Sequence, residues 1–211
     1  QQDGQNLRAV DSVSLTVAEG DFVAILGHSG SGKTTLLSLI GGLARPDEGN
    51  VFIKGSDCWQ QGEEALAVMR NQTIGFSFQF GSLIPTLTSI ENILLPLSFA
   101  DAGTNPVDNI PLARELLDQV GLVDKENSFP AQLSGGQQRR VAIARALVTD
   151  PEMILADEPT GNLDTHTAAA VHALFMDLNK KNGITLVMVT HNEDLASRAD
   201  RRFKMTDGVV E

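Results

Sequence analysis

Residues 27–34 combine the residue types that bind the phosphates of a nucleotide. They read Gly27-His28-Ser29-Gly30-Ser31-Gly32-Lys33-Thr34, between an apolar run (22–26) and a helical run (35–40). Glycines let the backbone curl so that its N–H groups face phosphate oxygens. Lys33 is placed to reach the terminal phosphates, and the Thr34 hydroxyl to hold Mg²⁺. The order strand, loop, helix favours a phosphate-binding loop, with Thr35 beside it, over a glycine-rich turn with a surface lysine.

A second anion site is predicted far along the chain, at Leu133-Ser134-Gly135-Gly136-Gln137. These residues stand just ahead of a helical run, 138–147. The first N–H groups of a helix have no intrahelical partner, and the helix dipole is positive at that end. A serine hydroxyl and two glycines leave these N–H groups bare, so the segment predicts a second contact to phosphate.

Acidic and imidazole side chains follow two other apolar runs. Asp157 and Glu158 follow run 153–156, and His191 stands just beyond run 185–189. An aspartate here is placed to hold Mg²⁺, and the adjacent glutamate can polarise an attacking water. An imidazole can bridge a terminal phosphate and a carboxylate. Taken alone, the alternatives are a solvated acidic turn and a structural histidine.

Two further polar residues have alternative interpretations. Gln79 lies in the apolar run 76–80, where it is either a ligand of Mg²⁺ or the lytic water, or a glutamine at the edge of the core. Asp164 can equally cap the helix expected after Thr165. We interpret His166 and His172 as surface or packing residues.

The elements that position these residues are read from hydrophobic patterns. Runs 22–26, 153–156 and 185–189 are continuously apolar, as strands of a parallel sheet covered by helices are. Each ends in polar residues, and open parallel sheets place chemistry at the carboxyl ends of their strands. Between the first two runs, Pro111 suits a first helical position and Gly121 a helix stop, with an exposed loop at 101–111.

Composition excludes several classes of protein. The chain has 211 residues, 42% of them hydrophobic, and a net charge of −11, which suits one α/β domain and disfavours general nucleic-acid binding. Its one cysteine, Cys58, excludes an internal disulfide and a cysteine-rich zinc site, so we expect a reducing cytosol. No apolar run approaches the roughly 20 residues of a membrane span.

Together the motifs resemble the nucleotide-binding subunit of an ATP-binding cassette (ABC) transporter. The resemblance covers essentially the whole chain, and it rests on six motifs in order: loop 27–34, Gln79, the signature 133–137, Asp157-Glu158, Asp164 and His191. It implies an α/β fold with a P-loop NTPase parallel sheet core (about 1–81 and 151–211), an inserted α-helical subdomain (about 82–150) and a small antiparallel β subdomain.

The same resemblance implies ATP and Mg²⁺ as cofactors and a head-to-tail homodimer. Each ATP would lie between loop 27–34 of one copy and the signature of the other, with Thr34, Gln79 and Asp157 at the metal. Glu158 would be the catalytic base and His191 the switch histidine. The implied partner is an integral membrane permease, which would hold the chain at the cytoplasmic side of the inner membrane; no nucleic-acid partner is expected.

Segments 83–92 and 156–164 look like the macrolide-export, lipoprotein-release and cell-division subgroup. An importer ATPase and a soluble ABC ATPase acting on DNA or ribosomes are the alternatives; a P-loop kinase would leave the signature unexplained. The family stacks adenine on an upstream aromatic, but no aromatic residue precedes Phe22. We therefore expect the first strand and the adenine-stacking loop to lie upstream of residue 1; a real loss of the aromatic would weaken adenine selectivity.

Overall fold

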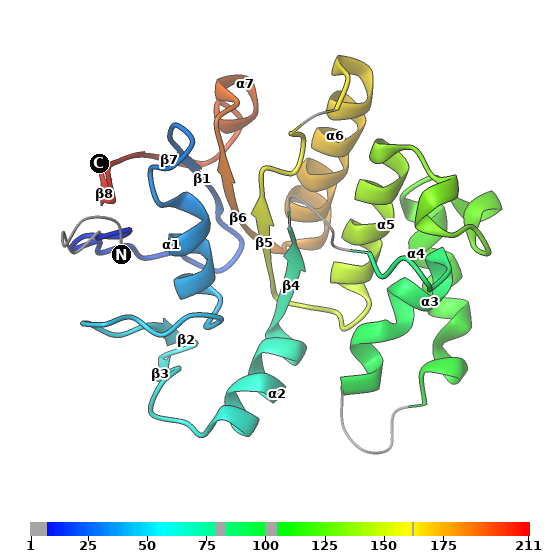
Figure 1. Ribbon diagram of the computed structural model, residues 1–211, viewed down its shortest axis with the longest axis horizontal. Coiled ribbons are helices and arrows are strands. Elements are labelled where there is room, and N and C mark those ends of the chain that lie inside the picture. The colour runs from blue at the N-terminus through cyan, green and yellow to red at the C-terminus, as the bar shows by residue number, and fades with distance from the viewer. Residues whose placement is uncertain (1–7, 79–82, 100–104, 162) are drawn as a thin grey trace.

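A six-stranded sheet forms the centre of the molecule (Figure 1). The computed structural model describes residues 8–78, 83–99, 105–161 and 163–211. Neighbouring strands are parallel except the last pair, β7 and β8. In spatial order the strands are β4 (Ile74–Ser77), β5 (Met153–Asp157), β6 (Thr185–Thr190), β1 (Phe22–Leu26), β7 (Arg201–Thr206) and β8 (Val209–Val210). The three strands expected from the apolar runs, β1, β5 and β6, are confirmed.

The central strands are buried on both faces, which explains their continuous apolar sequences. Leu186 and Met188 of β6 belong to a core that includes helix α6 (Thr165–Asn182) and short helix α7 (Glu193–Ala196). Val187 and Val189 belong to a second core, on the side of helix α1 (Lys33–Ile40). Alternate side chains of one strand thus attach helices to opposite faces of the sheet.

A mainly helical segment lies between β4 and β5. It contains α3 (Ser89–Leu94), α4 (Ile110–Gln119) and α5 (Gly135–Leu147), with 3₁₀ helices at Leu95–Phe99, Pro106–Asn109, Val123–Lys125 and Pro130–Gln132. The helix expected after Pro111 is therefore confirmed. The loop expected at 101–111 is wrong over 106–111, because Asn105 caps a 3₁₀ helix by accepting the N–H of Val107, and α4 already begins at Ile110.

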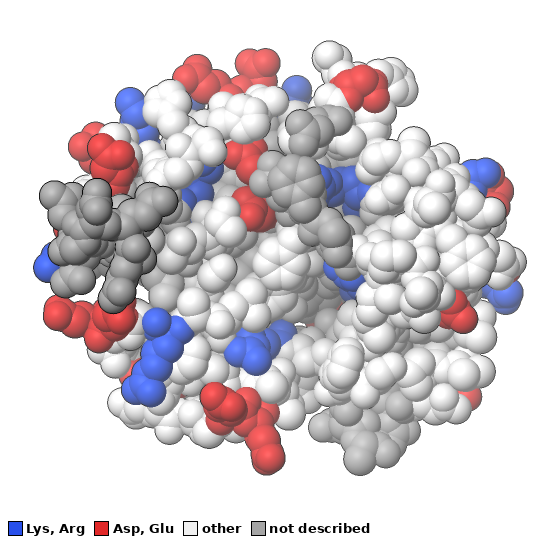
Figure 2. Space-filling model, in the orientation of Figure 1, with Lys and Arg blue, Asp and Glu red and all other residues white. Residues whose placement is uncertain are grey.

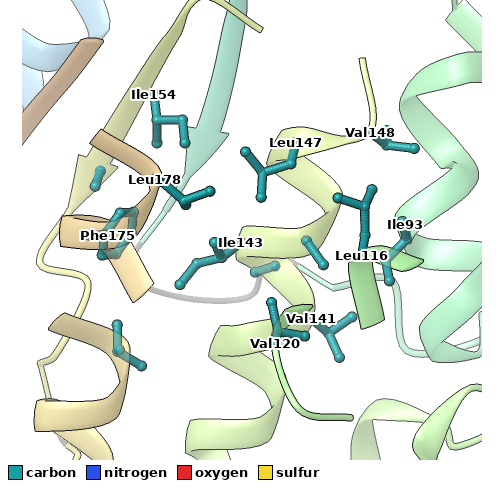
Figure 3. Packing of buried hydrophobic residues seen from close by; sticks show 14 of the residues in the cluster. Ile93, Leu116, Val120, Val141, Ile143, Leu147, Val148, Ile154, Phe175 and Leu178 are labelled. Atoms are coloured by element: carbon teal, nitrogen blue, oxygen red, sulfur yellow. The ribbon is translucent and has the colours of Figure 1, made fainter. Parts of the chain in front are cut away.

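Helix α5 connects this segment to the sheet. Figure 3 shows Ile143 and Leu147 directed toward Phe175 and Leu178 of α6, while Leu116 of α4 lies on the other side of the helix. All five side chains belong to one continuous hydrophobic cluster. These helices are thus packed against the same core as strands β5 and β6, and the division into core and helical subdomain stays a prediction.

A small antiparallel hairpin, β2 (Phe52–Ile53) with β3 (Ser56–Asp57), precedes helix α2 (Glu63–Thr73). The predicted α/β class with a mainly parallel sheet is confirmed. No helix in the described part of the chain combines the length and apolar character needed to cross a bilayer.

Gly75 permits the close approach of α5 to β4. A Cβ at this position would meet the backbone carbonyl oxygen of Ala146, in the last turn of α5. The β4 backbone cannot shift away without disturbing its pairing with β5, in which Gly75 pairs with Ile154.

We predict that Gly75→Ala lowers the free energy of unfolding by about 1–3 kcal/mol, because it overpacks this contact. Gly62→Ala is the control for the added methyl group, since a Cβ at Gly62 meets open space and only the N-cap preference of α2 changes, by about 1 kcal/mol or less. Chemical denaturation of the parent and both variants measures the free energies of unfolding. If Gly75→Ala is as stable as the parent, α5 and β4 are not in close contact.

Candidate functional site

The loop between β1 and α1 closes around its own lysine. Lys33 is buried, and its Nζ donates to the carbonyl oxygens of Gly27 at 2.8 Å and His28 at 2.9 Å. Gly30 and Gly32 have φ angles of +84° and +100°, which glycine adopts at little cost. The ammonium group therefore lies against the curled backbone of the predicted phosphate-binding loop.

Other members of this loop differ in exposure. His28, Ser29 and Gly30 are exposed, whereas the buried Oγ of Ser31 has no hydrogen-bond partner. A Cβ at Gly27 would lie 2.5 Å from the carbonyl oxygen of Met205, in β7. Glycine at position 27 is thus required by packing as well as by any phosphate.

Thr34 and Asp157 bring two oxygen atoms together. The Thr34 hydroxyl donates to Oδ2 of Asp157 at 3.0 Å, joining the start of α1 to the end of β5. Hydroxyl and carboxylate oxygens are ligands that Mg²⁺ prefers, and Mg²⁺ is usually held by one or two carboxylates together with water and substrate phosphates. Within the described residues, no three His, Cys, Asp or Glu side chains gather as a metal site. The pair therefore fits a Mg²⁺ ion that takes its other ligands from nucleotide and water.

Burial raises the pKa of Asp157 above its ordinary value. The hydrogen bond from Thr34 opposes this shift, the negative charge of Glu158 adds to it, and the positive charges of Lys33 and Arg139 oppose it. A buried carboxylate of this kind is stabilised by a cation placed beside it.

Glu158 is the centre of a second group of contacts. Its Oε2 lies 2.9 Å from Nδ1 of His191 and accepts the backbone N–H of His191 at 3.3 Å and the hydroxyl of Thr190 at 3.2 Å. Its Oε1 lies 4.0 Å from Nζ of Lys33. Glu158 is buried, whereas the His191 side chain is 67% exposed. The structure thus brings Lys33, Asp157, Glu158 and His191 together, as the sequence predicts.

The backbone of Glu158 is strained. Its φ of +43° lies in the left-handed region, which costs a non-glycine residue about 1–3 kcal/mol. Its N–H donates to the carbonyl oxygen of Val189 at 2.9 Å, which extends the pairing of β5 with β6 by one residue. This left-handed conformation turns the chain out of the sheet at Glu158, the residue that carries the carboxylate.

Sequence reasoning missed two residues of the site. Thr190 is fully buried and donates to Glu158; its place directly after the apolar run 185–189 and before His191 is a signal that points to it. Arg139, in α5, is buried and donates to the carbonyl oxygen of Phe78. Burial lowers the pKa of Arg139, and the charge of Asp157 opposes that shift. No local pattern indicates Arg139, because its contacts depend on how α5 packs.

The signature residues begin α5 in a reciprocal cap. Ser134 Oγ accepts the N–H of Gln137 at 3.2 Å, and the Gln137 side chain accepts the N–H of Ser134 at 2.8 Å. The expectation of bare N–H groups is therefore wrong for Gln137, whose N–H is satisfied by the serine that precedes the helix. Those of Gly135 and Gly136 have no intrahelical acceptor. A Cβ at Gly136 would meet the side chain of Thr167, so this glycine also has a packing role.

The signature and the phosphate-binding loop lie apart within one chain. In Figure 1, strands β5 and β6 and helix α6 separate the start of α5 from the loop between β1 and α1. Asp164 caps α6 by accepting the N–H groups of His166 and Thr167, and contacts from Thr167 lower the pKa of Asp164. Thr35 is exposed in α1, and Gln79 lies outside the described residues.

We predict that Asp157→Asn stabilises the metal-free protein at neutral pH. A raised carboxyl pKa means that the charged form destabilises the fold, a penalty absent below the unfolded pKa and complete above the folded one. In chelator, the variant should exceed the parent in melting temperature by most near pH 8, and the difference should shrink as the pH falls toward the ordinary carboxyl pKa of about 4. Asp47→Asn, at an exposed site, is the control; a variant that is less stable at pH 8 would contradict the prediction.

Comparison with known proteins agrees with this geometry. Residues 10–161 match the family model described as ABC transporter. The lipoprotein-releasing system ATP-binding protein LolD of Geobacter metallireducens is 50% identical over 198 residues, which cover 94% of this chain and 87% of that protein. The macrolide export ATP-binding/permease protein MacB of Rhodopirellula baltica is 45% identical over 205 residues, 97% of this chain but 30% of that protein.

Solved structures show the same fold. The dimeric structure of a bacterial ABC transporter cassette superposes with a TM-score of 0.92 at 42% identity, covering 100% of this chain and 91% of that one. A post-hydrolysis state of that cassette, with ADP and Pi bound, gives a TM-score of 0.87 at 39% identity, covering 100% of this chain and 93% of that one. The chain therefore belongs to the ABC transporter family, as an ATPase domain.

Proposed function

We propose that two copies of this chain pair head to tail and hydrolyse ATP at two shared sites to drive a membrane permease. The observation that carries the proposal is the separation of two anion-binding elements in one chain: Lys33 lies among loop carbonyls beside Glu158, while Ser134 begins a helix beyond β5 and β6. Pairing would supply the signature of one copy to the nucleotide of the other. A related cassette has been solved as a dimer, which supports this arrangement.

The residues at the strand ends then have complementary roles. Lys33 and the loop N–H groups bind the phosphates, and Thr34 with Asp157 would hold Mg²⁺, which neutralises phosphate charge when bound. Glu158 accepts a proton from the attacking water as the new O–P bond forms, the bond between the β- and γ-phosphates breaks, and ADP and phosphate leave. His191, 2.9 Å from Glu158, keeps that carboxylate turned toward the nucleotide.

A groove between α2, β4 and the end of α5 suits a permease segment. It has a volume of about 380 Å³ and a mainly apolar lining from α2, β4 and the 3₁₀ helix after α3, including Val68, Phe78, Pro96 and the 68% exposed Phe99, with Arg145 of α5. Figure 2 shows the hollow on this face, where basic side chains are scattered among acidic ones rather than gathered in one patch.

We propose that a cytoplasmic helix of the permease docks in this groove. Arg139 and Phe78 connect the groove to the site, because Arg139 contacts the Phe78 carbonyl and its charge acts on Asp157. The names of the relatives favour a lipoprotein-release or export complex over an importer. Docking would place the chain at the cytoplasmic side of the inner membrane.

Glu158→Gln should sharply lower turnover and preserve pairing. Loss of a general base costs roughly 10²–10⁴ in rate, whereas the amide keeps the size of the side chain. We expect ATP turnover to fall by that range and ATP to drive the variant into a dimer, measured by phosphate release and light scattering. Glu115→Gln, on the exposed side of α4, is the control. Normal hydrolysis, or a variant that stays monomeric with ATP, would contradict the mechanism.

Ser134→Ala should leave ATP binding to the monomer intact and impair hydrolysis. The change also removes a helix cap, worth about 1 kcal/mol, so a matched control is needed. Thr88→Ala removes the equivalent reciprocal cap of α3, formed with Glu91. We expect both variants to lose similar stability and only Ser134→Ala to lose turnover. Weaker ATP binding by the monomeric Ser134 variant would contradict the proposal, because it would mean that the signature contacts the nucleotide of its own chain.

A further inference from the structure

His172 is a buried titratable residue that the proposed hydrolysis does not use. It lies on α6, is 8% exposed, and its Nε2 is 3.3 Å from Oγ1 of Thr160, which is equally buried. Buried polar groups need partners, and here a ring nitrogen and a hydroxyl satisfy each other. This contact links the middle of α6 to the loop that follows β5.

Thr160 stands two residues after Glu158 in a tight loop. The N–H of Gly161 donates to the carbonyl oxygen of Glu158 at 3.0 Å, and the N–H of Leu163 donates to that of Thr160 at 3.3 Å. Glu158 itself is held at a φ of +43°, a conformation that persists only where its surroundings enforce it. An anchor on Thr160 therefore also restrains the backbone that carries the Glu158 carboxylate.

Helix α6 makes a rigid base for such an anchor. Asp164 caps its first turn, and Val171 and Phe175 pack on the sheet with 0% and 1% exposure. Burial and the positive charge of Arg198 lower the pKa of His172, and the negative charge of Asp194 opposes them. The ring is uncharged at neutral pH, with one N–H and one bare nitrogen, which suits a hydroxyl that both donates and accepts.

We propose that His172 is a positioning residue for ATP hydrolysis, whose contact with Thr160 fixes the loop that presents the Glu158 carboxylate to the nucleotide. This inference rests on the proposed role of Glu158. In this role His172 acts through Thr160 and not by contact with water or phosphate. Its removal should therefore slow the chemical step and leave nucleotide binding unchanged.

The test compares His172→Leu, which removes both ring nitrogens, with His172→Gln, which keeps a polar group near the Nε2 position. Since a hydrogen bond is worth about 0.5–1.5 kcal/mol, we expect His172→Leu to lower kcat roughly 2- to 13-fold with KM for ATP within about twofold. His172→Gln should restore most of kcat. His166→Leu, at an exposed position of the same helix, should behave as the parent.

A double-mutant cycle identifies the partner. Thr160→Val should lower kcat as His172→Leu does, and the double variant should be no slower than either single one. Unchanged kcat in His172→Leu, additive losses, or a loss of thermal stability with raised KM that His172→Gln does not restore would each overturn the proposal.

Glu158→Gln separates this inference from the proposed function. If that variant still hydrolyses ATP, the role of Glu158 is wrong and the positioning role fails with it. If Glu158→Gln is inactive while His172→Leu is fully active, only the positioning role is wrong. In the Glu158→Gln background, His172→Leu should cause no further loss of residual turnover.

Discussion

The parallel register of β1, β6 and β5 is the constraint on which the site depends. Leu26 pairs with Thr190, and Asp157 pairs with Val189, so the three strands end at the same level of the sheet. Each chain then leaves the sheet by a different route: the glycine-rich loop after β1, the left-handed turn at Glu158 and the polar residues after β6. A shift of one residue in either pairing would move the functional side chains to other faces.

The same register brings buried charged side chains together at the ends of the strands, and these charges favour binding of a charged ligand. Lys33, Asp157 and Glu158 are all buried, in a cluster with hydrogen bonds from Thr34 and Thr190. Lys33 and Arg139 offset part of the negative charge, but burial still raises the pKa of Asp157, so this carboxylate is costly to keep charged. A divalent cation beside Asp157 would lower that cost, and its charge would in turn favour the phosphates of a nucleotide.

Local patterns in the sequence were sufficient for strands β1, β5 and β6 and for the loop after β1, but not for β4, β7 and β8. Continuous apolar runs identify β1, β5 and β6 because both faces of these strands are covered, and the spacing of glycines around Lys33 fixes the loop after β1. Asp164 stayed ambiguous from sequence; its hydrogen bonds to the start of α6 explain it as a cap, and a nucleotide contact stays a prediction.

Contacts that depend on packing between distant elements were not predictable. Gly75 meets Ala146, Arg139 meets Phe78, and His172 meets Thr160 only because α5 packs against β4 and α6 packs beside it against the same core. The interpretation of His172 as a surface or packing residue followed from its neighbours in sequence, none of which contributes its partner. The exposed loop expected at 101–111 failed for a related reason, since Asn105 and Pro106 are turn formers that here begin a 3₁₀ helix.

The central claim is that a nucleotide site contains residues of two copies. Cross-linking tests it directly, using cysteines in place of exposed Ser29 and of Gly135, where a Cβ finds its nearest neighbour 4.0 Å away. Cys58 is buried and can remain. In the Glu158→Gln background, the account predicts that ATP produces a disulfide-linked dimer carrying both substitutions, and that either substitution alone produces none. A monomer that forms the disulfide within itself, or a pair that never cross-links with ATP, would contradict it.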